Sequence, residues 1–184
     1  GWNMNQVARH LSKELNFNHS EVLKLLSDEE LIKELQINSN TLEGYLFPET
    51  YYFFEGVDEI SVIKRLVKEH KRFWNDANLS KADSLGFTPY EIITLASIIE
   101  GEAIYDSERS IISAVYHNRL KIGMKLQADP TVQYIIDDGP RRLLNKDLRI
   151  KSPYNTYMYQ GLPPGPINSP GEQSLIAALS PQDN

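Results

Sequence analysis

The stretch from Thr88 to Ala103, TPYEIITLASIIEGEA, decides the fold of this 184-residue chain. Thr88 is suited to cap a helix, Pro89 fits the first helical position, and Glu91 completes a capping box three residues after the cap. The apolar residues that follow occupy almost the whole circumference of such a helix: Ile92, Ile93, Leu95, Ala96, Ile98 and Ile99. Because a helix that is apolar all round is a buried one, the stretch predicts a central helix in the core.

Composition sets outer limits on what the chain does. It is 41% hydrophobic and 24% charged, which is typical of a globular domain with a core. Its net charge of −6 argues against nucleic acid as the main partner, because phosphate binding needs clustered Lys and Arg. It contains no cysteine, which excludes disulfide frameworks, thiolate zinc sites and cysteine nucleophiles. The chain begins at Gly1 rather than at a methionine, so we expect it to be a segment of a longer protein.

Helices are predicted on both sides of this stretch. Residues 3–36 show three short apolar stripes, and Ser27 with Glu30 forms a capping box for the third of them. Apolar periodicity and start signals predict four more helices, at residues 58–80, at residues 107–120, from Asp129, and after Ser169 through Leu175 to Leu179. Asp129 and Ser169 each precede a proline, so we expect both of them to be cap residues.

Three segments are expected not to be helical. Residues 41–54, TLEGYLFPETYYFF, are dense in aromatic residues and interrupted by Gly44 and Pro48, which predicts a loop or a pair of strands on the core. Glu43 and Glu49, within that segment, are either surface carboxylates or part of a cleft wall. Residues 152–159 predict a short strand, and residues 161–171 an ordered proline-rich loop. The predicted fold class is therefore α+β, rich in helix with a small β-sheet.

The sequence lacks the motifs on which most catalytic chemistries depend. The four histidines, His10, His19, His70 and His117, have no metal-ligand spacing, so no metal site is predicted. There is neither a phosphate-binding GxxxxGK[ST] loop nor a dinucleotide-binding GxGxxG, and no cofactor is expected. Ser97 does not stand in a nucleophile elbow. Carboxylates remain as the candidate catalytic groups.

Glu100 is the stronger of two carboxylates at the end of the predicted buried helix. Positions two apart on a helix differ by about 200°, so Glu100 and Glu102 cannot flank one glycosidic bond as a hydrolase pair. Glu100 continues the row of Ala96 and Ser97, whose small side chains leave room for a substrate or a partner side chain. The negative end of the helix dipole and burial both predict a raised pKa for Glu100, as a general acid requires. The alternative is a structural ion pair of Glu100 with Arg109 or Arg119.

Further polar and aromatic groups suit a sugar, for which hydrogen bonding and ring stacking are the usual contacts. The candidate substrate-binding residues are Gln127, Asp129, Thr131, Tyr154, Asn155 and Tyr157. Each also has a plain structural interpretation. Asp129 is suited to cap a helix, and Asn155 to close a turn.

The longest motifs resemble a known family. They are ASIIEGEA, ERSIISAVYHNRLKIGMKLQADPTVQY and SPYNTYMYQGLPPGPINSPGEQSLIAALSP, with LEGYLFPETYYF upstream. In order, spacing and length they resemble the YceG-like endolytic murein transglycosylases, and the likeness runs from about Gly1 to the last residue. The family more often has a charged residue at the position of Gly101, which puts nothing catalytic in doubt.

The resemblance implies a function. Such enzymes cleave peptidoglycan glycan strands internally, between N-acetylmuramic acid and N-acetylglucosamine, without water and with a 1,6-anhydro-muramyl end. The single catalytic glutamate falls on Glu100, and no cofactor or metal is implied. A second interpretation, from a different class, is a non-catalytic peptidoglycan-binding scaffold module for a cell wall synthase.

The resemblance also implies a setting. Peptidoglycan glycan strands and peptidoglycan synthases are the expected partners, with no nucleic acid. One N-terminal helix outside this chain is expected to anchor the protein in the bacterial cytoplasmic membrane, with the catalytic domain on the periplasmic, extracytoplasmic side. Residues 1–41 would form a helical N-terminal subdomain adjoining a LysM-like region. Residues 42–184 would form the catalytic domain, and family members continue beyond its C-terminal end.

Overall fold

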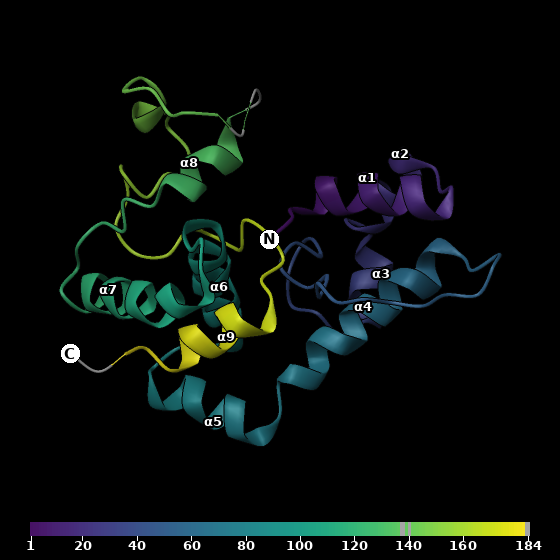
Figure 1. Ribbon diagram of the computed structural model, residues 1–184, viewed down its shortest axis with the longest axis horizontal. Helices are drawn as coiled ribbons and strands as arrows, with labels where there is room; N and C mark the ends of the chain where they lie inside the picture. The colour runs from purple at the N-terminus through teal and green to yellow at the C-terminus, as the bar shows by residue number, and fades with distance from the viewer. Residues whose placement is uncertain (137–138, 140, 183–184) are drawn as a thin grey trace.

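The computed structural model describes residues 1–136, 139 and 141–182, and helix α6 (Pro89–Glu102) is its centre (Figure 1). Helices α5 (Asp76–Ser84), α7 (Arg109–Lys121), α8 (Asp129–Ile135) and α9 (Glu172–Leu179) all contact it. Every residue from 92 to 99 is at most 2% exposed. The predicted buried central helix is confirmed.

Helix α6 begins as its sequence predicts. The Thr88 Oγ1 accepts a hydrogen bond from the Glu91 backbone N–H at 3.3 Å, and the Glu91 carboxylate accepts one from the Thr88 N–H at 2.8 Å. This reciprocal pair satisfies donors that a helix start leaves without partners. It also fixes where the buried segment begins, and therefore where its last turn, with Glu100, ends.

The first part of the chain forms the three predicted short helices. They are α1 (Met4–Leu15), α2 (His19–Leu25) and α3 (Glu29–Glu34), and they lie with α4 (Glu59–Phe73) on one side of α6 (Figure 1). The predicted capping box of Ser27 and Glu30 is wrong by one residue. Asp28 caps α3 instead, because its Oδ1 accepts a hydrogen bond from the Leu31 N–H at 2.8 Å.

The segment predicted as one helix over residues 58–80 is two helices. Helix α4 (Glu59–Phe73) ends where Trp74 leaves the helical region, with φ −84° and ψ 64°. Asn75 then caps α5, and its Oδ1 accepts from the Asn78 N–H at 3.0 Å. An apolar periodicity that continues across a short break cannot reveal the break, whereas the Asn-Asp pair that follows Trp74 is a start signal.

Helices α7, α8 and α9 occur near the predicted positions, but two of the predicted caps are wrong. Short 3₁₀ helices occur at Asp106–Glu108 and Asp147–Arg149. Gly171, without a side-chain cap, precedes α9, while the Ser169 Oγ accepts from the Leu46 N–H at 3.2 Å. Asp129 is the first residue of α8 and makes no capping bond. Both side chains hold distant segments together rather than their own helices.

The predicted α+β class with a small β-sheet is wrong. Within the described part of the chain, the only β-pairing is one isolated antiparallel bridge between Trp2 and Ser169. Residues 152–159, predicted as a strand, fold into consecutive turns around Asn155. Its N–H donates to the Ser152 carbonyl at 2.9 Å, and its own carbonyl accepts from the Met158 N–H at 3.0 Å. The Asn155 side chain stabilises these turns, which is why an aromatic-rich segment does not extend.

Residues 41–54 form a loop, the first of the two structures predicted for them. A turn at its start brings the Tyr45 N–H to the Leu42 carbonyl at 3.0 Å. Gly44 has φ +87°, and a Cβ there would lie 2.4 Å from Pro166. A side chain is therefore excluded both by backbone conformation and by the close approach of the proline-rich loop. The 41–54 loop is held between α6 and residues 161–171.

Glu43 fastens α1 to this loop. It is 4% exposed, and its two carboxylate oxygens accept from the Met4 N–H at 3.0 and 3.1 Å. Burial raises the pKa of Glu43 from its usual 4.5 to about 7, although the Met4 hydrogen bond opposes this. Because the pKa is higher in the folded chain, Glu43 favours folding below about pH 4.5, and this contribution is lost as the pH rises through about 7.

We expect Glu43→Gln to flatten the pH dependence of stability. Glutamine stays neutral, so the change of about 3 kcal/mol that this shift in pKa represents should disappear from the unfolding free energy measured between about pH 5 and about pH 8. Urea denaturation at several pH values would measure it. The control is Glu49→Gln, whose side chain is exposed. Parallel pH curves for wild type and Glu43→Gln would contradict this account.

Candidate active site

Glu100 lies at the C-terminal end of α6, where three other segments meet it. Its Oε2 accepts hydrogen bonds from Arg109 Nη1 at 3.1 Å and from the Ser174 Oγ at 2.5 Å, with the Gly171 N–H at 3.4 Å. Its Oε1 is 3.2 Å from the Gly1 ammonium. The Glu100 side chain is 15% exposed. The first turns of α7 and α9 therefore hold one oxygen, and the other oxygen meets the start of the chain.

The expected rise in the pKa of Glu100 is wrong. Burial is the largest single influence and does raise the pKa, but the Ser174 hydrogen bond, the Gly1 ammonium and Arg109 together lower it more. The net result is a pKa below the usual 4.5. The ion pair with Arg109, which the sequence left open as an alternative, is present. Glu100 is therefore ionised at neutral pH in this arrangement.

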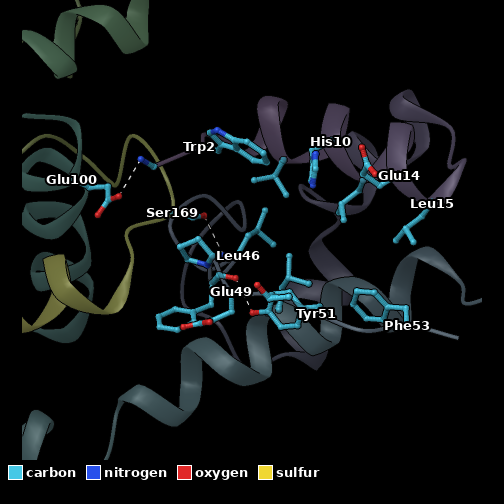
Figure 2. Close-up of a pocket in the computed structure, with 17 residues that line it drawn as sticks. Trp2, His10, Glu14, Leu15, Leu46, Glu49, Tyr51, Phe53, Glu100 and Ser169 are labelled. Atoms are coloured by element: carbon cyan, nitrogen blue, oxygen red, sulfur yellow. Dashed lines mark hydrogen bonds and ion pairs between the residues drawn. The ribbon is translucent and has the colours of Figure 1, made fainter. Parts of the chain in front are cut away.

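A groove of about 800 Å³ runs from Glu100 along the N-terminal helices (Figure 2). Trp2, His10 and Glu14 form one side, and Glu49, Tyr51 and Phe53 form the other. In the view of Figure 2, Glu100 lies at one end, and Leu15 and Phe53 lie at the other. The groove joins the half-buried Glu100 carboxylate to a channel between α1 and the 41–54 loop.

Aromatic rings line much of this groove. Trp2 and His10 meet edge to face with their centroids 4.8 Å apart, and Tyr51 stacks on Phe53 at 6.0 Å. The Tyr51 hydroxyl donates to the Phe47 carbonyl at 2.7 Å, which fixes its ring. Ring faces with interspersed carboxylates such as Glu14 and Glu49 can stack on sugars and accept hydrogen bonds from their hydroxyls.

The small residues before Glu100 do not leave an empty space. The Ser97 Oγ accepts from the Ile167 N–H at 3.1 Å, and the Ser97 carbonyl accepts from the Asn168 Nδ2 at 2.8 Å. The proline-rich loop of residues 161–171 thus packs against the row of Ala96 and Ser97. It carries Asn168 to the neighbourhood of Glu100.

Two of the six candidate substrate-binding residues are enclosed. Thr131 is fully buried, and its Oγ1 contacts the Ala128 carbonyl at 2.7 Å and the Thr156 Oγ1 at 2.8 Å. Asn155 is also fully buried, and its Nδ2 donates to the Leu148 and Ile150 carbonyls at 3.2 and 2.8 Å. Both side chains hold the backbone of residues 148–156 in place.

The other four lie nearer the surface. The Tyr157 hydroxyl donates to Asp129 Oδ1 at 2.5 Å, and Gln127 is exposed with φ +51°. Tyr154 packs on Tyr134, with ring centroids 5.0 Å apart. None of the six lines the groove beside Glu100.

The charged groups that act on Glu102 are Asp129 and Arg119, and not Glu100. Burial first, and then the charge of Asp129, raise the pKa of Glu102, and Arg119 opposes them. A Cβ on Gly101 would lie 2.7 Å from Pro130, so the last turn of α6 rests on the start of α8. The two glutamates thus have separate partners on the two sides of this turn.

Several groove residues were not predicted as site residues. The aromatic density of residues 45–54 and the alternative of a cleft wall for Glu49 were the only signals for that side. Nothing in the sequence of α1 distinguishes His10 and Glu14 from residues of a solvated helix face. In the described ranges, no group of three His, Asp or Glu side chains could hold a metal ion. The same residues include no helix of the length and apolarity needed to cross a bilayer.

Known proteins place this architecture in a family. The family model of the YceG-like family matches residues 1–184. An endolytic murein transglycosylase of Bacillus subtilis is 37% identical over 98% of this chain and 54% of its own length. One of Streptococcus pneumoniae serotype 2 is 34% identical over 76% of this chain and 26% of its own.

A solved structure agrees. The crystal structure of a yceG-like protein of Listeria monocytogenes superposes with a TM-score of 0.90 at 33% identity, covering 100% of this chain and 65% of that one. The chain thus spans about half the length of the Bacillus relative and about two thirds of the Listeria chain. On sequence and fold together, this chain belongs to the YceG-like family.

Proposed function

We propose that the chain is the catalytic part of an endolytic peptidoglycan lytic transglycosylase, with Glu100 as its single acid/base. The observation that carries this proposal is the position of Glu100 at the end of a long aromatic-lined groove. Relatives named endolytic murein transglycosylase support it. The groove leads away from Glu100 on one side and can hold the sugars on that side of the cleaved bond.

The reaction needs only one carboxyl group. Protonated Glu100 donates its proton to the glycosidic oxygen as the bond from the muramyl C1 breaks. The resulting carboxylate then takes the proton of the muramyl C6 hydroxyl, whose oxygen bonds to C1 and closes the anhydro ring. The substrate's own acetamido group assists at C1 between these steps, as in substrate-assisted glycosidases. A single positioned acid contributes about 10²–10⁴-fold to the rate.

Before Glu100 can act as the acid, its carboxylate must take up a proton when the glycan binds. Gly1 holds Oε1, whereas Arg109 and Ser174 hold Oε2. A glycan that lies beside Oε1 excludes water from Glu100, and this change raises its pKa. Oε1 is then the oxygen that faces the glycosidic bond, and Oε2 stays fixed.

The test of this proposal is digestion of purified sacculi followed by mass spectrometry of the fragments. Lytic cleavage within strands should yield fragments with anhydro-muramyl ends and a wide range of lengths. Reducing ends that carry an added water would mean a hydrolase. Products of one short length would mean cleavage from strand ends.

A non-catalytic scaffold module is the second candidate function. The lowered pKa of Glu100 and its four partners favour it, because they satisfy the carboxylate without a substrate. In that case neither wild type nor Glu100→Gln would cleave sacculi, and both would bind glycan strands equally. Cleavage by wild type alone would exclude the scaffold as the sole role.

The wider setting is part of the same proposal. Action on cell wall glycan implies an extracytoplasmic location, and the family resemblance implies a single-pass anchor in the cytoplasmic membrane and synthase partners. Residues 1–41 would serve as the helical subdomain that supplies one wall of the groove, and residues 42–184 as the catalytic domain. Gln127, Asp129, Tyr154 and Tyr157 would bind substrate outside the groove, with Asp129 and Tyr157 close to Glu102.

We expect Tyr51→Ala to weaken glycan binding by about 2–12-fold, the loss of about 0.5–1.5 kcal/mol that a stacked ring provides. Its neighbour Tyr52 is the control, because Tyr52 is 95% exposed and does not line the groove. Titration of each variant with soluble glycan strands would measure the effect. Equal affinities for Tyr51→Ala and Tyr52→Ala would show that glycan binds elsewhere.

A further inference from the structure

Asn168 carries a buried acceptor that nothing in the described chain satisfies. The residue is 6% exposed, and its Nδ2 donates to the Ser97 carbonyl at 2.8 Å. Because that carbonyl can only accept, the amide orientation is fixed and Oδ1 points the other way. Oδ1 is buried without a hydrogen-bond partner among the described residues. Such an acceptor destabilises a fold by about 1–3 kcal/mol, so its retention needs a reason.

The unsatisfied oxygen lies beside Glu100. A Cβ built on Gly1 would be 2.5 Å from Asn168 Oδ1 and 2.7 Å from Glu100 Cγ. The two side chains therefore flank one small volume, which Gly1 enters because it has no side chain. The Ser169 N–H, next to Asn168, donates to the Trp2 carbonyl at 2.9 Å and holds Gly1 and Trp2 there. A sugar that reaches Glu100 Oε1 would also lie close to Asn168 Oδ1.

We propose that Asn168 Oδ1 accepts a hydrogen bond from the acetamido N–H of the sugar whose glycosidic bond Glu100 cleaves. This inference rests on the proposed function. An amide oxygen only accepts, and the acetamido N–H is a group of the substrate that only donates. The pairing therefore selects N-acetylated sugars and fixes the acetamido group relative to Glu100.

The same hydrogen bond also serves the reaction. As the C1–O glycosidic bond breaks, the acetamido carbonyl oxygen bonds to C1 and the leaving oxygen takes the Glu100 proton. Positive charge then spreads onto the acetamido nitrogen, so its N–H donates more strongly to Oδ1. When the C6 oxygen attacks C1, the bond from C1 to the carbonyl oxygen breaks, Glu100 takes the C6 hydroxyl proton, and the acetamido group is restored. Asn168 gains and loses no proton in either step.

Two ligands and three proteins test this inference. The ligands are a synthetic tetrasaccharide of alternating N-acetylglucosamine and N-acetylmuramic acid, and its isostere in which 2-acetoxy replaces 2-acetamido on the muramyl residues. The isostere keeps the shape and lacks only the N–H. The proteins are the Glu100→Gln chain, which does not turn over, and the same chain with Asn168→Ala or Asn168→Asp. Calorimetric titration gives each dissociation constant, and thermal unfolding checks each fold.

With Asn168 present, the amide ligand should bind about 10–100-fold more tightly than the ester, because a site built for an N–H rejects an analogue without it. Asn168→Ala should reduce this ratio to about threefold or less. Asn168→Asp, which keeps an acceptor oxygen, should retain most of it. A residue that only supports the fold would weaken both ligands equally.

The outcomes separate this inference from the proposed function. An unchanged ratio in Asn168→Ala, or no binding of either ligand, would overturn the role of Asn168. The proposed function fails on a different result, which is wild-type chain that binds the amide ligand but produces no anhydro ends from sacculi. The predicted ratio of the affinities for the amide and ester ligands can therefore be confirmed or contradicted independently of the cleavage assay.

Discussion

Glu100→Gln is expected to reduce glycan cleavage by about 10²–10⁴-fold, the contribution of one positioned general acid. Glutamine keeps the size of the side chain and can still accept from Ser174, but it cannot transfer the proton. The loss should fall on kcat rather than on glycan affinity, because the groove itself is unchanged. Release of anhydro-ended fragments from sacculi would measure cleavage, and titration with soluble strands would measure binding.

Glu102→Gln is the matched control for this variant. It removes a carboxylate of the same helix turn, two residues away, whose electrostatic neighbours are Asp129 and Arg119. Cleavage by Glu102→Gln should stay within about threefold of wild type, since only transition-state contacts change kcat strongly. If Glu102→Gln lost cleavage and Glu100→Gln kept it, the acid would be assigned to the wrong side of α6.

Arg109→Gln is expected to shift the pH dependence of cleavage to higher pH. Burial raises the pKa of Glu100, but Ser174, the Gly1 ammonium and Arg109 outweigh it and lower the pKa. A general acid must be protonated, so kcat falls as the pH rises through its pKa in the complex. Removing the Arg109 charge raises that pKa, because a neighbouring positive charge favours the ionised carboxylate. The fall in kcat should therefore move to higher pH.

Arg119→Gln provides the comparison for Arg109→Gln. The charge of Arg119 lowers the pKa of Glu102, not that of Glu100. Its pH profile should match that of wild type, although the variant loses the hydrogen bond from Arg119 to the Leu126 carbonyl. An unmoved profile for Arg109→Gln would mean that the group that limits the pH range is not Glu100.

The central helix and its start could be predicted from the sequence because their causes are local. The Thr88–Glu91 capping box and an apolar run too broad for one face both act within a few residues. The cap at Ser27 and the single helix over residues 58–80 were wrong for a related reason. Several residues near each boundary could serve as caps, and geometry rather than composition selected Asp28 and Asn75.

The sheet was predicted from aromatic density, which is a weaker guide. Strand propensity mostly reflects packing against neighbours, so it does not distinguish a strand from a buried irregular segment. In residues 152–159, the Asn155 side chain satisfies carbonyls at Leu148 and Ile150 and makes consecutive turns stable. Those side-chain contacts are not visible as a period in the sequence.

In the candidate site, too, features with local causes could be predicted and features that depend on distant residues could not. The sequence placed Glu100 at the end of a buried helix, which is found, and offered Arg109 or Arg119 as its partner, of which the structure shows Arg109. It could not show that Ser174 and Gly1 reach the same carboxylate across 74 and 99 positions of sequence, so the direction of the pKa was wrong. Asn168 was hidden in a proline-rich loop, because an unsatisfied oxygen can be recognised only when its surroundings are known.

The most direct test of the account is to digest sacculi in water enriched in heavy oxygen and to analyse the new glycan ends by mass spectrometry. If Glu100 transfers the proton and the muramyl C6 oxygen closes on C1, the new ends should be anhydro-muramyl residues without heavy oxygen. The Glu100→Gln chain should produce almost none of them. New reducing ends that carry heavy oxygen, or undiminished anhydro ends from Glu100→Gln, would contradict the account.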